Sequence, residues 1–149
     1  MTFNEKQGTT KRNASGNGNG VHVAAGQILI VDDMASIRRH LRDILESNGY
    51  TVVGEAEDGD QALGMVRKHK PDLVIMDIVM ERMNGIDATR AIRSEFPSAS
   101  IVMITQEAKP SVVLRSIQAG AKNFVIKPFR EQQVLNVVRN ALAQNAAQS

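Results

Sequence analysis

The sequence of 149 residues contains no cysteine and no tryptophan, and only one tyrosine and four phenylalanines. The absence of cysteine excludes disulfide bonds, thiolate metal sites and thiol nucleophiles. With so few aromatic rings to stack on bases, direct nucleic-acid binding is not expected. No apolar run approaches the roughly 20 residues that span a bilayer, and the amino terminus does not resemble a signal peptide. We therefore expect a cytoplasmic protein without a membrane partner.

The net charge of +2 is concentrated at the start of the chain. Residues 1–26 carry three basic side chains against one acidic side chain, so the rest of the chain is neutral. This segment is rich in Gly and Asn and lacks apolar periodicity, so burial cannot offset the entropy cost of ordering it. We predict a flexible basic leader over 1–26, one folded domain over 27–145 and a short tail over 146–149.

Short apolar runs alternate with segments of helical periodicity in the remaining chain. The runs predict five buried strands, over 28–31, 51–53, 73–76, 101–104 and 123–126. Apolar residues recur at three- and four-residue spacing between and after them, as in amphipathic helices. The strict alternation predicts an α/β fold, a doubly wound (βα)5 unit whose parallel sheet is covered on both faces. The second run is the most polar, which places it at an edge.

Turn and capping residues set the expected helix ends. Asp58 and Asn84 precede the second and third predicted helices, where their side chains suit the N-cap position. Pro110 suits the first turn of the fourth helix, and Gly120 suits its end. The fifth helix is expected to begin near Arg130.

Polar residues follow four of the five predicted strands. They are Asp32, Asp33, Asp77, Thr105 and Lys127. Each alone has an ordinary explanation as a helix cap or a solvated charge. In a doubly wound sheet, however, ligands bind beyond the carboxyl ends of the strands, where all five would meet. The shared edge therefore predicts a functional site.

The residue types at this edge suggest its chemistry. Three neighbouring carboxylates repel one another and raise at least one pKa unless a cation lies among them. Ligands that are all oxygen favour Mg²⁺, with Mn²⁺ as a substitute. Lys127 and Thr105 would then face an anion, and an ammonium with a hydroxyl suits the oxygens of a phosphoryl group.

Taken together, these residues resemble the receiver domain of bacterial response regulators, especially stand-alone CheY-like proteins. The resemblance covers about 27–143, and its motifs lie at 28–33, 55–59, 72–78, 83–85, 104–105, 119–121 and 127–129. It implies a flavodoxin-like fold whose five-stranded parallel sheet has the order 2-1-3-4-5. It also implies a phosphoacceptor signalling protein rather than an enzyme that turns over a substrate, and a place in chemotaxis or motility.

The resemblance assigns roles to the strand-end residues. It implies that Asp77 accepts a phosphoryl group from a histidine kinase and holds it as an acyl phosphate. Asp33, Asp77 and the main-chain carbonyl of Val79 would bind Mg²⁺, while Asp32 would orient its waters. Lys127 would pair with a phosphoryl oxygen.

The resemblance also implies a conformational switch and an output surface. Thr105 would turn toward the phosphoryl group, and Phe124 would move into the vacated space. That shift would alter the face formed by the fourth helix, the fifth strand and the fifth helix, on which partner proteins dock. Lys127 would be joined to Pro128 by a peptide bond that the family usually keeps cis. We expect a monomer or a weak dimer linked to phosphorylation.

Four positions depart from the usual family pattern. Glu81 replaces a proline, so the loop after the third strand is expected to be looser and more acidic. Gln106 replaces a small residue, so it is expected to restrict phosphodonor entry or to bond the phosphoryl group. Val79 cannot orient a hydrolytic water with its side chain, so we expect slow self-dephosphorylation. Phe124 replaces a tyrosine, so its partner contacts are expected to be apolar.

Other functions fit the residues less well. A haloacid-dehalogenase-type phosphatase needs a second aspartate where Val79 stands, and a P-loop needs Lys-Ser/Thr where the sequence has Asp60-Gln61. A flavin binder would need aromatic platforms and phosphate loops. Two alternatives stay open: a phosphorelay intermediate that passes phosphate to a histidine phosphotransfer protein, and a phosphate-independent interaction module. We expect no output domain after the fifth helix, and the docking partner is left open among a motor switch component, a phosphotransfer protein and a regulated enzyme.

Overall fold

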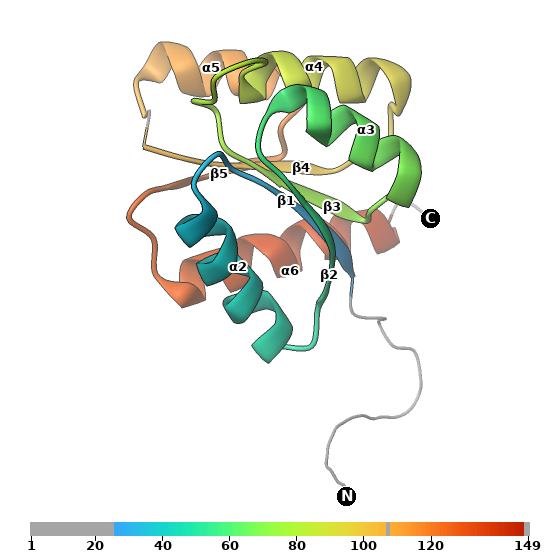
Figure 1. Cartoon of the computed structure of the whole chain (residues 1–149), viewed down its shortest axis with the longest axis vertical. Coiled ribbons are helices and arrows are strands. Elements are labelled where there is room, and N and C mark those ends of the chain that lie inside the picture. The colour runs from blue at the N-terminus through green and yellow to red at the C-terminus, as the bar shows by residue number, and fades with distance from the viewer. Residues whose placement is uncertain (1–25, 107, 148–149) are drawn as a thin grey trace, which may run out of the picture.

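The computed structural model describes residues 26–106 and 108–147 (Figure 1). The predicted leader therefore lies outside the described residues except for Gly26. Strands and helices alternate along the chain in the order β1 (Gln27–Val31), α2 (Ala35–Ser47), β2 (Thr51–Ala56), α3 (Gly59–His69), β3 (Leu73–Met76), α4 (Gly85–Glu95), β4 (Ile101–Thr105), α5 (Pro110–Ala119), β5 (Asn123–Ile126) and α6 (Glu131–Ala147). Within the described residues, none of the helices is both long and apolar enough to cross a membrane.

The five strands form one parallel sheet of order β2-β1-β3-β4-β5. This order confirms the predicted topology, including the edge position of the polar second strand. Helices α2 and α6 cover one face of the sheet, and α3, α4 and α5 cover the other (Figure 1). The strands β1, β3 and β4 are buried along nearly their whole length because both faces are covered.

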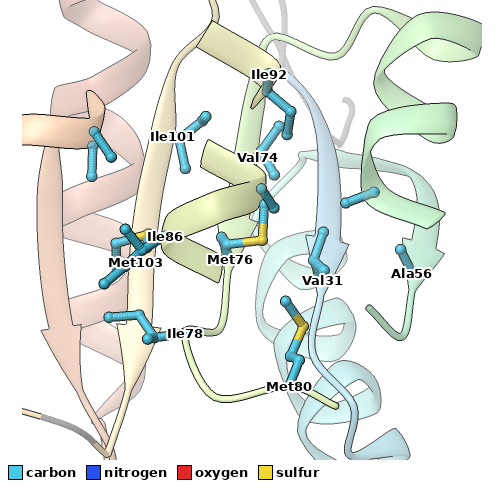
Figure 2. Packing of buried hydrophobic residues seen from close by; sticks show 14 of the residues in the cluster. Val31, Ala56, Val74, Met76, Ile78, Met80, Ile86, Ile92, Ile101 and Met103 are labelled. Atoms are coloured by element: carbon cyan, nitrogen blue, oxygen red, sulfur yellow. The ribbon is translucent and has the colours of Figure 1, made fainter. Parts of the chain in front are cut away.

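Each face of the sheet packs its own apolar core. The core beneath α3, α4 and α5 is the larger, and Figure 2 shows how its side chains converge from strands and helices. Leu41, Ile44 and Leu45 of α2 are buried in the opposite core, as the spacing of apolar residues predicts. Burial of this kind contributes roughly 25 cal/mol per Å² of apolar surface, so the two cores hold the strand ends in place.

The capping residues lie where the sequence predicts them. The side chain of Asp58 accepts a hydrogen bond from the backbone N of Gln61 at 2.9 Å. Asn84 similarly accepts one from the backbone N of Asp87 at 2.9 Å. Gly120 follows α5 with a φ of +116°, a left-handed conformation that glycine adopts without strain.

Two element boundaries differ from the predicted ones by more than one residue. The second strand continues three residues further, to Ala56, because Gly54 and Glu55 pair with Leu29 and Ile30 of β1. Gly54 and the polar Glu55 follow the apolar run in the sequence, yet an edge strand accommodates both. The last helix runs to Ala147, so its final two residues lie in the segment predicted as a short tail.

Gly85 fits the start of α4 tightly against the end of β3. Its backbone N donates a hydrogen bond to the carbonyl of Ile78 at 2.8 Å. A Cβ at this position would lie 2.0 Å from the main-chain oxygen of Asp77, far inside van der Waals contact. Only a residue without a side chain lets α4 approach the strand end so closely.

We predict that Gly85→Ala destabilises the protein by about 3 kcal/mol, because the backbone around Asp77 must shift to admit the methyl group. Denaturant unfolding measures the change. Gly64→Ala is the matched control, since Gly64 lies in α3 with open space around its Cα. This control should gain about 0.5 to 1 kcal/mol from helix propensity. A Gly85→Ala protein as stable as the parent would contradict the close approach.

Candidate functional site

Two aspartates are brought together by the pairing of β1 with β3. Val31 and Met76 are partners in the register of the two strands, so the residues that follow them, Asp32 and Asp77, emerge side by side. The backbone N of Asp77 donates to the carbonyl of Val31 at 2.9 Å and fixes this alignment. With Asp33, they offer three carboxylate oxygens within 4.8 Å of one another. The predicted convergence of the acidic residues is thus present in the structure.

Asp32 is fully buried and bonded at each of its polar groups. One carboxylate oxygen, Oδ1, accepts from the backbone N of Met34 at 2.9 Å, and Oδ2 accepts from Lys127 Nζ at 2.8 Å. Its backbone N donates to the carbonyl of Ala56 at 3.1 Å. A buried carboxylate needs such partners because it has lost its hydration. The Asp32 carboxylate is consequently held in one orientation on the buried side of the site.

Lys127 directly follows β5 and reaches the acidic residues from the other side of β4. Besides its contact with Asp32, its Nζ lies 3.5 Å from Oδ2 of Asp77. Its backbone N donates to the carbonyl of Thr105 at 2.9 Å, and its peptide bond to Pro128 is cis. The ammonium therefore partly balances the carboxylates and stands beside an oxygen of Asp77.

Among the acidic side chains of the described residues, Asp77 has the most strongly shifted pKa. Burial raises the pKa of its carboxyl most, the negative charges of Asp32 and Asp33 raise it further, and Lys127 opposes them. The result is a pKa of about 6, against an ordinary value of 3.8. A carboxylate that resists ionisation because of its neighbours gains most from a cation placed among them.

The donor set fits a hard divalent cation. Asp33 is exposed and lines a polar cavity of about 390 Å³ with Glu57, Asp58, Gln61, Glu81 and Arg82, so a hydrated ion can approach it. Sites with few carboxylate ligands and several waters are typical of Mg²⁺. The cluster of Asp32, Asp33 and Asp77 could therefore hold a metal ion. A larger cavity of about 550 Å³, which Asp72 and Ser100 help to line, lies at the opposite edge of the sheet.

Of the remaining predicted site residues, Thr105 and Val79 lie at the same end of the sheet, whereas Phe124 lies further back in β5, where it pairs with Met103 of β4. Thr105 is the last residue of β4 and is fully buried, and it pairs in register with Ile126 of β5. Phe124 is partly buried and packs against the core beneath α3, α4 and α5. Val79 follows Asp77 by two residues, and the residue is 58% exposed to solvent. The roles assigned to these residues by resemblance stay predictions.

One side chain at the site was missed by the sequence reasoning. Arg38 of α2 donates from Nη1 to the main-chain carbonyl of Asp32 at 2.6 Å and from Nε to Oε1 of Glu55 at 2.9 Å. In the sequence it is one of three arginines in an amphipathic helix, and nothing in the spacing distinguishes it. The one signal in the sequence was Glu55, a charged residue shortly after the predicted second strand, which favours a cation nearby but does not indicate which of the basic residues supplies it.

We predict that Asp77 makes the metal-free protein less stable as pH rises from 3.8 through about 6, because ionisation is disfavoured only in the folded state. Asp77→Asn should abolish this contribution. At pH 7 its free energy of unfolding should exceed that of the parent by up to about 3 kcal/mol, which corresponds to a pKa shift from 3.8 to about 6. Unfolding curves in EDTA at several pH values measure it. Asp43→Asn, which removes an exposed carboxylate of α2, is the control; equal pH slopes for the parent and Asp77→Asn would refute the expectation.

Comparison with known proteins gives a consistent result. The family model described as response regulator receiver domain matches residues 28–139. The chemotaxis protein CheY of Bacillus subtilis is 46% identical over 118 residues, which cover 79% of this chain and 98% of the relative. CheY of Thermotoga maritima is 42% identical over 112 residues, covering 75% and 93%.

A solved structure agrees with the assignment. The crystal structure of the CheX-CheY-BeF3-Mg²⁺ complex from Borrelia burgdorferi contains a chain with 32% sequence identity and a TM-score of 0.75, and the match covers 76% of this chain and 87% of that one. The parallel sheet, the strand order and the acidic strand ends therefore agree with an extensive sequence match. The chain belongs to the family of response regulator receiver domains.

Proposed function

We propose that this receiver domain accepts a phosphoryl group on Asp77 from the phosphohistidine of a histidine kinase, within a cytoplasmic chemotaxis or motility pathway. The observation that supports the proposal best is the position of the Asp77 carboxylate, which lies among two other carboxylates and 3.5 Å from Lys127. The similarity to CheY proteins supports the chemotaxis assignment.

The transfer needs a nucleophile and neutralisation of charge more than it needs an acid or a base. An Asp77 carboxylate oxygen attacks phosphorus, the bond from phosphorus to the histidine nitrogen breaks, and its electron pair stays on the imidazole. Lys127 donates to a phosphoryl oxygen, and the hydroxyl of Thr105 turns toward another. The two groups thereby stabilise the charge on the oxygens as the acyl phosphate forms.

Asp33, Asp77 and the main-chain carbonyl of Val79 would hold Mg²⁺, with Asp32 orienting its water ligands. The ion would supply positive charge that lets an anionic nucleophile approach an anionic donor. Mn²⁺ has similar oxygen preferences and is proposed as a substitute. Asp32 fits its role because its hydrogen bonds to Met34 and Lys127 fix the carboxylate before an ion arrives.

We propose that partner proteins dock on the face formed by α5, β5 and α6. Leu114 and Ile117 of α5 and Ile126 of β5 are about half exposed, at 57%, 46% and 50%. Apolar side chains that gather on neighbouring elements are typical of a protein docking surface. Phe124 lies in β5 within this face, so a movement of Thr105 and Phe124 on phosphorylation would alter the surface that a partner contacts.

Phosphorylation is predicted to occur once per chain and to require Asp77. Incubation with acetyl phosphate and Mg²⁺ should increase the intact mass by one phosphoryl group, and Asp77→Asn should abolish the increase. Glu57→Gln is the matched control, because it removes a neighbouring carboxylate outside the proposed acceptor and metal ligands. Mass spectrometry measures the outcome. An unmodified parent chain, or an Asp77→Asn chain that is still phosphorylated, would refute the proposal and favour a phosphate-independent module.

The acyl phosphate is predicted to be long-lived, because the exposed side chain of Val79 cannot hydrogen-bond an attacking water. Val79→Asn supplies an amide that can orient this water and should accelerate dephosphorylation several-fold. Decay of the phosphorylated mass after removal of the donor measures the rate, and Val79→Ala is the control for side-chain size. An Asn variant that loses phosphate no faster than the parent would count against this account.

A further inference from the structure

We infer that Arg38 is a positioning residue for the metal site, which it serves by fixing the peptide bond between Asp32 and Asp33. The inference rests on the proposed binding of Mg²⁺ by Asp33 and Asp77. Arg38 itself touches neither proposed ligand carboxylate. It acts on the main chain that carries one of them.

The guanidinium of Arg38 links the end of β1 to the edge strand β2. Its Nη1 donates to the carbonyl oxygen of Asp32 at 2.6 Å, and its Nε donates to Oε1 of Glu55 at 2.9 Å. Only 12% of the Arg38 side chain is exposed, so the contacts are shielded from competing water. The planar fork of donors holds both acceptors in one fixed geometry.

The contact with Asp32 determines where Asp33 lies. A peptide unit is planar, so the carbonyl oxygen of Asp32 and the N and Cα of Asp33 share one plane. Fixing the oxygen fixes the rotation of this plane about the end of β1. Because Asp33 is exposed and leaves the strand at this point, the orientation of the peptide governs the direction of its carboxylate toward Asp77.

Glu55 anchors the arginine from the other side. It pairs in register with Ile30 of β1, and its second oxygen accepts from Arg42 Nε at 2.8 Å. Burial alone would raise the pKa of Glu55, but the hydrogen bonds from Arg42 and Arg38 hold it below its ordinary value. The anchor is thus an ionised carboxylate with two arginine partners, and of these two Arg38 is the one that also bonds the main chain of Asp32.

Positioning and simple charge predict opposite effects on metal affinity. Removing a positive charge near an acidic cluster strengthens the attraction of a cation. Removing a group that orients a metal ligand weakens binding instead, as seen when the outer hydrogen-bond partners of metal ligands are lost. The sign of the change on replacing Arg38 therefore separates the two roles.

The test is a Mg²⁺ titration of the full chain followed by amide chemical shifts in NMR spectra. Arg38→Met should raise the dissociation constant for Mg²⁺ by about tenfold. Arg38→Lys keeps the charge but not the fork, so it should also weaken binding. Arg42→Met is the matched control, since it removes an arginine from the same Glu55 without touching Asp32 and should bind Mg²⁺ like the parent.

Each outcome bears on a different claim. Weaker binding in both Arg38 variants, with Arg42→Met unchanged, supports the positioning role. Unchanged or tighter binding by the Arg38 variants overturns it, and so does an equal loss in Arg42→Met, which would indicate general loosening of α2. A parent chain that does not bind Mg²⁺ would instead refute the proposed function. If Arg38→Met fails to fold, as judged by circular dichroism, the Arg38→Lys titration decides.

Discussion

Repulsion among carboxylates held within 4.8 Å of one another is the interaction on which the proposed function depends. Asp32, Asp33 and Asp77 cannot move apart, because they terminate or follow paired strands of a buried sheet. Burial and the two neighbouring charges raise the pKa of Asp77 to about 6, and Lys127 relieves this only in part. A divalent cation would relieve the rest, so the folded state is prepared for the metal that the proposed transfer requires.

The scaffold around the carboxylates maintains this unfavourable arrangement. Two apolar cores hold the sheet from both faces, and backbone hydrogen bonds join the strand ends to one another. Gly85 lets α4 approach the main chain at Asp77, while Arg38 ties the turn after β1 to the edge strand. Stability gained from packing elsewhere thus offsets electrostatic strain at the site, as is common where function and stability conflict.

Much of this was readable from the sequence, because parallel strands with alternating helices have few possible arrangements. The alternation of strands and helices implied a parallel sheet, in which the carboxyl ends of the strands lie along one edge. The meeting of Asp32, Asp33 and Asp77 could therefore be predicted before any contact was known. The contacts of Arg38 could not, since they depend on side-chain direction and on Glu55 lying one strand away. The extra length of β2 was missed for a similar reason: pairing with β1 overrides the local polarity of the chain.

The most direct test of this account is the titration of the Asp77 carboxyl carbon by ¹³C NMR, without Mg²⁺ and with saturating Mg²⁺. Without the ion, the carbon should titrate with a pKa of about 6. With the ion, the pKa should fall well below that value, because a bound cation favours the ionised carboxylate. An Asp77 carbon that titrates at the same pH in both conditions would contradict the claim that these carboxylates gather to bind a cation.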